Sequence, residues 1–168
     1  MSPVSALDRK TFVNRFGGVY EHSIWIAEST WDRGLTPRED AAAGLHAAMI
    51  DIVDLAGREP QLRLLCAHPD LAGKRAIQQK LTTESEAEQA SAGLDECSVD
   101  ELSELKACNA RYRSLFGFPY ILAVRGQTVQ AILGNFRSRI KNDPATEFQE
   151  ALSQVHQIAL LRLKSLLD

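Results

Sequence analysis

The residues best suited to chemistry lie between residues 68 and 95, which is the least core-like stretch of the sequence. His68 follows the apolar run that ends at Ala67, and Pro69 comes directly after it. Because proline pushes the preceding residue away from helical dihedral angles, we expect His68 at the end of a helix, facing a cleft. Imidazole exchanges a proton near neutral pH without a large change in its pKa, so this position suits proton transfer.

A helix is predicted to begin shortly after His68. Thr83 and Glu86 have the spacing of a capping box, which places Thr83 at the N-cap and Glu86 at N3. Gly93 suits the C′ position that follows a helix, so the predicted helix ends at residue 91 or 92.

Three polar residues of this predicted helix, Ser85, Glu88 and Gln89, stand at i, i+3 and i+4 and therefore share one face. A hydroxyl, a carboxylate and an amide beside a helix N-terminus suit an anionic or carbonyl-rich ligand. The alternative is a solvated polar face, which is the usual fate of charged helix surfaces.

Composition limits the classes of protein to which the chain can belong. With 168 residues, 45% of them hydrophobic and 24% charged, it is expected to form one globular domain over residues 1–168. A net charge of −3 without a basic stripe argues against binding to nucleic acid. No apolar stretch approaches membrane-spanning length and no signal-peptide core is present, so we expect a cytoplasmic protein that does not enter membranes.

Apolar periodicity predicts an all-α fold, a single compact domain of about eight or nine helices. The helix at 36–57 starts at Thr36-Pro37-Arg38-Glu39, which combines a capping box with proline at N1. The predicted helices span residues 7–15, 19–31, 36–57, 61–67, 83–92, 98–115, 128–141 and 145–167, while residues 71–81 are ambiguous.

Two features stand out from this helical pattern. Residues 118–124 are strand-like but have no obvious partner strand, so we expect one buried extended segment whose backbone groups must find hydrogen-bond partners. Those partners are either a ligand or the protein and water. Arg162 interrupts an apolar run, and its guanidinium must reach a carboxylate, an anion or the solvent.

Several separated motifs resemble the ureidoimidazoline decarboxylases, which convert 2-oxo-4-hydroxy-4-carboxy-5-ureidoimidazoline (OHCU) to (S)-allantoin at the end of urate degradation. The resemblance covers nearly the whole chain. Its motifs are Phe16-Gly-Gly-Val-Tyr-Glu21, His68-Pro-Asp-Leu-Ala-Gly-Lys74, Glu84-Ser85, Glu88-Gln89-x-Ser91-Ala-Gly93 and Asn109-x-x-Tyr112-x-x-x-Phe116-Gly-Phe-Pro-Tyr120.

The resemblance implies an enzyme whose site residues can be named. His68 is the expected general acid or base, and Glu88 the catalytic carboxylate that orients the substrate. The expected substrate-binding residues are Pro69, Ser85, Gln89, Phe118, Ile121, Ala123 and Arg162. OHCU contains its own electron sink, so no metal or other cofactor is expected. The family also implies a homodimer.

Three other functions are compatible with parts of this pattern. A metal-dependent hydrolase using His68 and Asp70 would need a third ligand that no motif supplies. A helical adaptor without catalysis predicts that His68 and Glu88 are replaceable and that an apolar groove dominates the surface. A decarboxylase acting on a related ureido acid would keep the site but change its substrate.

Overall fold

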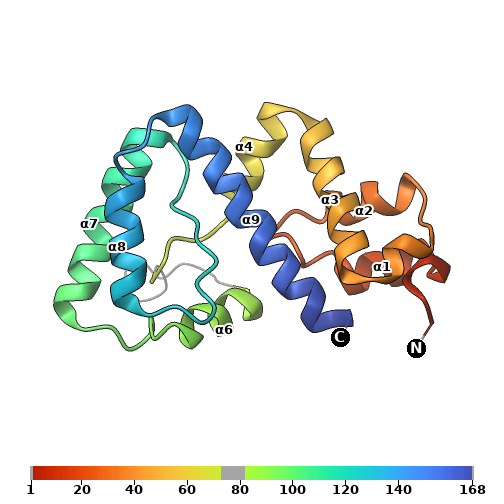
Figure 1. Ribbon diagram of the computed structural model, residues 1–168, viewed down its shortest axis with the longest axis horizontal. Helices are drawn as coiled ribbons and strands as arrows, with labels where there is room; N and C mark the ends of the chain where they lie inside the picture. The colour runs from red at the N-terminus through yellow and green to blue at the C-terminus, as the bar shows by residue number, and fades with distance from the viewer. Residues whose placement is uncertain (1, 73–81, 168) are drawn as a thin grey trace. The chain divides into compact units, whose positions relative to one another are not determined.

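The computed structural model describes residues 2–72 and 82–167 and is shown in Figure 1. All regular structure in these residues is helical, which confirms the predicted all-α class. No helix in the described ranges is both long and apolar enough to cross a membrane. The elements are η1 (Val4–Ala6), α1 (Arg9–Phe16), α2 (Trp25–Asp32), η2 (Pro37–Asp40), α3 (Ala42–Ala56), α4 (Arg58–Cys66), α6 (Thr83–Ser91), α7 (Val99–Phe116), α8 (Val129–Arg139) and α9 (Pro144–Leu167).

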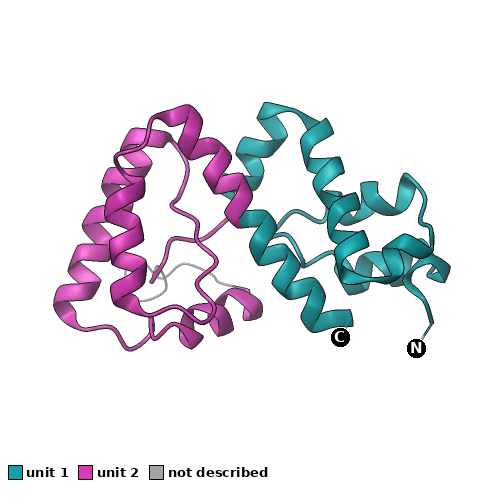
Figure 2. Ribbon diagram, viewed as in Figure 1, with its two compact units in different colours: residues 1–67, 155–168 teal, residues 68–154 magenta. Residues whose placement is uncertain are grey.

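Contacts between residues divide the chain into two compact units, which Figure 2 distinguishes by colour. Unit 1 comprises residues 1–67 and 155–168, and unit 2 comprises residues 68–154. Helix α9 therefore contributes its first part to unit 2 and its second part to unit 1. The prediction of one domain over residues 1–168 stays a prediction.

Unit 1 is built from consecutive helices that pack in pairs, α1 on α2, α2 on α3 and α3 on α4. Their apolar faces, together with the second part of α9, form a core that water does not reach. Its fully buried side chains include Phe12, Phe16, Ile26, Leu45, Met49, Val53, Leu64, Leu65, Val155, Ala159 and Leu163.

Unit 2 has an aromatic core around residues 118–124, a segment without helix or strand in which every residue is buried. Tyr120 stacks on Phe136 of α8, with ring centroids 3.7 Å apart. Tyr112 of α7 meets Phe118, Tyr120 and Phe136 edge-on. Such pairs contribute about 0.5–1.5 kcal/mol each beyond the area they bury. The predicted burial of residues 118–124 outside any sheet is therefore confirmed.

Two predicted helices in unit 1 differ from the structure. The capped start at Thr36 is confirmed, with Pro37 at N1, but it begins the 3-10 helix η2, and the predicted continuous helix 36–57 is wrong because Ala41 is extended before α3 begins. The chain folds back tightly here, because a Cβ on Gly44 would lie only 1.8 Å from the Arg38 carbonyl oxygen. The helix expected from residue 19 begins only at Trp25, after His22 adopts a positive φ of 47°.

The signals at both ends of α7 are confirmed. The Ser98 side chain accepts a hydrogen bond from the Glu101 amide at 3.1 Å, and the Glu101 side chain accepts one from the Ser98 amide at 2.9 Å. Gly117 ends the helix in the left-handed region, at a φ of 78°. Helix α7 is thereby fixed in register, with Asn109, Tyr112 and Leu105 on its buried face.

Candidate active site

His68 lies where the sequence predicts it, directly after the end of α4. The helix ends at Cys66 with Ala67 as its C-cap, and Pro69 prevents it from continuing. The His68 side chain is buried, with 7% of the residue exposed. Its imidazole therefore belongs to the interior of the protein and not to the solvated surface.

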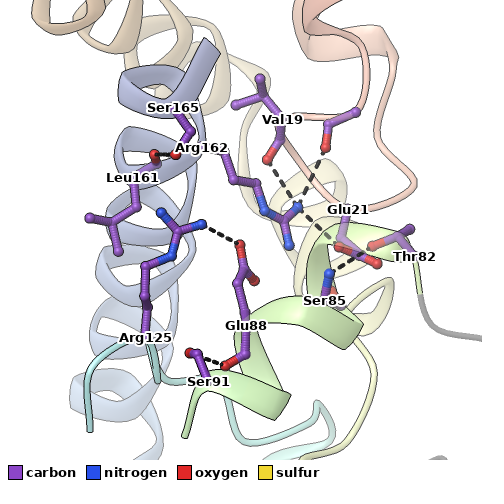
Figure 3. Close-up of polar contacts among 11 residues, drawn as sticks. Val19, Glu21, Thr82, Ser85, Glu88, Ser91, Arg125, Leu161, Arg162 and Ser165 are labelled. Carbon is purple, nitrogen blue, oxygen red and sulfur yellow. Dashed lines mark hydrogen bonds and ion pairs between the residues drawn. The ribbon is translucent and has the colours of Figure 1, made fainter. Parts of the chain in front are cut away.

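Helix α6 begins one residue earlier than the sequence suggested. The N-cap is Thr82, whose hydroxyl accepts a hydrogen bond from the Ser85 amide at 3.2 Å (Figure 3). An N-cap residue needs extended dihedral angles, which Thr82 has, whereas Thr83 is already helical. The capping box predicted for Thr83 and Glu86 is therefore wrong. Gly93, with a φ of 74°, follows the helix as expected.

The polar face of α6 is buried. Ser85, Glu88 and Gln89 are all shielded from solvent, while Glu84 and Ala87 on other faces are exposed. The solvated-face interpretation is therefore wrong. Burying a hydroxyl, a carboxylate and an amide costs free energy unless each has polar partners. This face is thus a polar surface that lies inside the protein.

Glu88 is held by a residue that the sequence analysis did not identify. Nη2 of Arg125 lies 3.7 Å from Glu88 Oε1, and Ser91 donates a hydrogen bond to the Glu88 carbonyl at 2.7 Å (Figure 3). Arg125 is the first exposed residue after the buried 118–124 segment. The sequence could have indicated Arg125 through its position at the end of a segment that was predicted to line the site.

Gln89 has a fixed amide orientation. Its Oε1 accepts a hydrogen bond at 2.9 Å from the backbone N–H of Ala72. Because that backbone group can only donate, the oxygen of the side chain must face Ala72 and the NH₂ group must face the other way. Gln89 therefore presents hydrogen-bond donors, which suit a ligand carbonyl.

The backbone of the 118–124 segment has protein partners at the positions predicted to contact substrate. Arg139 Nη1 donates to the Ile121 carbonyl at 2.5 Å. The Ala123 amide donates to Gln154 Oε1 at 3.0 Å, and Gln127 donates to the Ala123 carbonyl at 2.9 Å. Contacts of Ile121, Ala123 and Phe118 with substrate stay predictions.

Arg162 reaches a carboxylate, which is one of the three environments predicted for it. In unit 1 its Nη1 lies 3.1 Å from Glu21 Oε2, and it donates to the carbonyls of Val19 and Gly18 at 3.3 and 3.4 Å (Figure 3). Arg162 and Glu21 are both buried. Sequence analysis assigned Glu21 to a motif but did not pair it with Arg162.

The structure thus brings together part of the predicted site. Ser85, Glu88 and Gln89 share one buried face, and Gln89 joins that face to the segment that begins with His68. Pro69 lies in that segment. Arg162 belongs to unit 1, and its participation in the same site stays a prediction. Among the residues that the structure describes, no three His, Cys, Asp or Glu side chains are grouped to hold a metal ion.

Comparison with known proteins gives consistent matches. A family model described as OHCU decarboxylase matches residues 5–164. The 2-oxo-4-hydroxy-4-carboxy-5-ureidoimidazoline decarboxylase of Haloferax volcanii is 43% identical over 164 residues, which cover 97% of this chain and 93% of that protein.

Two solved structures share the fold. A crystal structure of (S)-allantoin synthase superposes with a TM-score of 0.77 at 34% identity, covering 98% of this chain and 53% of the other, so the chain spans about half of that protein. A crystal structure of OHCU decarboxylase in the presence of (S)-allantoin superposes with a TM-score of 0.69 over 96% of this chain and 99% of the other. At 21% identity this second likeness supports the fold alone.

Proposed function

Because the chain belongs to the OHCU decarboxylase family, we propose that it decarboxylates OHCU to (S)-allantoin in the degradation of urate. The observation that carries this proposal is the similarity to the Haloferax decarboxylase along nearly the whole of both chains. The buried polar face of α6 beside the His68 segment agrees with it, since decarboxylation needs groups that orient a carboxylate and move a proton.

The substrate provides the route for the electrons. Its carboxylate sits on a ring carbon that also bears a hydroxyl, next to a C=N carbon that holds the ureido group. When the C–C bond breaks and carbon dioxide leaves, the electron pair moves into the C=N unit, whose nitrogen takes up a proton, and an enol remains. The hydroxyl then loses its proton to become the ring carbonyl, and the ureido-bearing carbon gains a proton. The protein therefore has to orient groups and transfer protons, without an additional electron sink.

His68 and Glu88 are the proposed catalytic residues. Imidazole can accept and return a proton near neutral pH, which suits His68 as general acid or base. The carboxylate of Glu88 can hold the substrate hydroxyl or a ring N–H. Burial of both residues strengthens these interactions, because the surrounding dielectric is lower than in water.

Recognition of the ureido and carbonyl groups is the proposed role of the remaining residues. The Gln89 amide points its NH₂ group away from Ala72 and can donate to a carbonyl, and Ser85 lies on the same buried face. Arg162 would hold a negatively polarised oxygen, and Phe118 with the backbone at Ile121 and Ala123 would line the site. Pro69 would fix the approach to His68.

Stereochemistry is the reason for having an enzyme here. In water the intermediate can be protonated on either face, which gives racemic allantoin. A fixed proton donor reaches one face only, so the protein would produce a single enantiomer, for which the family implies the (S) form.

Near-ultraviolet circular dichroism tests the proposal. OHCU is generated from urate with urate oxidase and hydroxyisourate hydrolase, and its decay is followed with and without the protein. Faster formation of optically active (S)-allantoin is expected. Racemic product at the spontaneous rate would contradict the proposal and favour a helical adaptor.

The same assay tests His68. His68→Ala is expected to lower turnover about 10²- to 10⁴-fold while the helical circular-dichroism spectrum is kept. The control is Arg111→Gln, because Arg111 is an exposed residue of α7 outside the proposed site. Unchanged turnover in His68→Ala would remove this residue from the mechanism.

Assembly and location complete the proposal. The family resemblance implies a homodimer, which light scattering on the purified protein would measure as twice the mass of 18.6 kDa. We also propose a cytoplasmic location, which fluorescence microscopy of the tagged chain would test.

A further inference from the structure

The segment that follows His68 is buried although it has no regular secondary structure. Asp70, Leu71 and Ala72 are each about 5% exposed or less. A buried segment outside helices and sheets must satisfy its polar groups through side chains or water. The partners of these three residues therefore determine how the segment, and His68 with it, is held.

Three side chains from two helices of unit 2 hold this segment at consecutive residues. Arg113 Nε donates to Asp70 Oδ1 at 3.0 Å, and Asn109 Nδ2 donates to the Leu71 carbonyl at 3.1 Å. Gln89 Oε1 accepts from the Ala72 amide at 2.9 Å. We call these three contacts the clamp.

The two contacts from α7 come from one face of that helix. Asn109 and Arg113 stand at i and i+4, so their side chains are neighbours along the helix. Asn109 Oδ1 accepts no hydrogen bond from the described residues, so the amide of this buried side chain bonds through its donor to Leu71. Asn109 therefore binds the backbone of the segment through its side-chain N–H group.

Ala72 shows that the segment needs to be held. Its φ is 57°, in the left-handed region that residues with a Cβ rarely adopt. Such a conformation persists only where the surroundings over-determine it. The Gln89 oxygen on the Ala72 amide and the Asn109 amide on the Leu71 carbonyl supply that constraint on both sides of the peptide bond between the two residues.

We propose that Arg113, Asn109 and Gln89 are positioning residues, which fix the His68 imidazole relative to the Glu88 carboxylate through the clamp. Pro69 has a fixed φ, so few free torsion angles separate Asp70 from His68. Holding Asp70 in place therefore restricts the orientation of His68. Gln89 is the sequence neighbour of Glu88, so its contact with Ala72 ties the His68 segment to the helix that carries Glu88. This role rests on the proposed decarboxylation.

Arg113→Gln tests the clamp, because the Arg113 side chain is 42% exposed and its replacement leaves the core packed. The expected result is a kcat lower by about 10- to 100-fold with KM changed less than about two-fold, since an imidazole misplaced by a fraction of an ångström loses its transfer geometry but not substrate binding. The enantiomeric excess of allantoin is expected to fall. Arg113→Lys, which keeps the charge, should recover part of the loss.

Arg111→Gln is the matched control, an exposed arginine of the same helix that makes no contact described for the clamp. It should retain kcat and enantiomeric excess. Asn109→Leu, which has a similar shape but no donor for the Leu71 carbonyl, should reproduce the Arg113→Gln effect. Circular dichroism and thermal melting measure the folded fraction of each variant.

The outcomes separate the two proposals. If the unaltered chain does not accelerate OHCU decay, the proposed function fails, and the clamp has no role in this reaction. If the unaltered chain does accelerate OHCU decay, and both variants keep its kcat and enantiomeric excess, the proposed function stands and the positioning role is overturned. A loss that follows only the folded fraction, at full enantiomeric excess, would make the clamp structural and would also overturn the proposal.

Discussion

Each unit of the chain buries an ion pair between an arginine and a glutamate, yet the two pairs differ in geometry. The side-chain exposures are the same, 5% for the arginine and 0% for the glutamate in both. In unit 2, Nε and Nη2 of Arg139 lie 2.7 and 2.5 Å from Glu147 Oε1. In unit 1, Nη1 of Arg162 lies 3.1 Å from Glu21 Oε2. Equal burial therefore accompanies a shorter pair in unit 2 and a longer one in unit 1.

The unit 2 pair is the centre of a network. Glu147 accepts hydrogen bonds from Tyr112 at 2.5 Å and from Asn142 at 3.0 Å, and Arg139 also donates to Ile121 and covers the Tyr120 ring. Burial, and then the hydrogen bond to Glu147, raise the pKa of the Tyr112 hydroxyl, which therefore stays a donor. This network connects α7, α8, α9 and the 118–124 segment.

The contacts of the unit 1 pair described above join α9 to one other segment. The contacts of Arg162 with Glu21, Val19 and Gly18 all go to the segment between α1 and α2, and their lengths are 3.1–3.4 Å. Charge-assisted hydrogen bonds are strongest at about 2.7–2.9 Å. The same residue types at the same burial thus form short contacts within a structural network in unit 2 and longer contacts in unit 1, which is compatible with a substrate-binding arginine.

The largest expected effect is on stability. Arg139→Met should lower the free energy of unfolding by about 3–5 kcal/mol, because it leaves the buried Glu147 charge without its cation. Arg162→Met should cost less, since its contact with Glu21 is longer. Urea denaturation of both variants measures the difference. Equal losses would remove the distinction between the pairs.

In a double variant that removes both charges of the unit 1 pair, stability and turnover should respond differently. In the double variant Arg162→Met with Glu21→Gln no uncompensated buried charge remains, so stability should return toward that of the unaltered chain. If Arg162 binds substrate, turnover should stay about 100-fold lower, the equivalent of one lost charge-assisted hydrogen bond. Recovery of turnover with stability would instead make Arg162 a structural residue like Arg139.

These contrasts lie at the limit of what the sequence predicts. Local signals located His68 at a helix end, the Ser98 cap and Gly117 stop of α7, and the shared face of Ser85, Glu88 and Gln89. Each depends on residues within a few positions of one another, where backbone sterics and helix periodicity decide the outcome.

Contacts between distant residues were not predictable in the same way. Glu21 and Arg162, or Asp70 and Arg113, meet only because the fold brings them together. The local signal at Thr36 was correct for the cap but did not reveal the length of the helix, because the extended residue Ala41 separates η2 from α3. The choice between Thr82 and Thr83 as N-cap lay within the usual uncertainty of helix boundaries.

A smaller effect depends on pH and distinguishes unit 1 through its histidines. His156 Nδ1 pairs with the Tyr20 hydroxyl at 2.8 Å, and His46 Nε2 donates to the His156 carbonyl at 2.7 Å. Burial, and then the neighbouring His46, lower the pKa of His156 to about 4. The folded protein therefore resists protonating His156 at a pH where the unfolded chain, with a pKa of about 6.5, takes up a proton.

Stability linked to His156 should thus be complete above pH 6.5 and be lost as the pH falls toward 4. The expected loss between pH 7 and pH 5 is about 2 kcal/mol. Urea denaturation at both pH values measures it, with His156→Gln as the variant that should lack this part of the pH dependence and His22→Asn as the exposed control. The same loss in His156→Gln would assign the acid sensitivity to other groups.

The smallest expected effect is on the cap of α6. This local contact in unit 2 should contribute far less to stability than the Arg139 network. Thr82→Ala should lower the free energy of unfolding by about 1 kcal/mol, because the Ser85 amide loses its acceptor. Thr83→Ala should cost less, since an exposed residue in the first turn has no capping role there. A larger loss in Thr83→Ala would move the N-cap back to the position that the sequence suggested. If Thr82→Ala instead approached the loss in Arg139→Met, the order of unit 2 would depend on α6 as much as on its ion pair, and the contrast between network and local contact would fail.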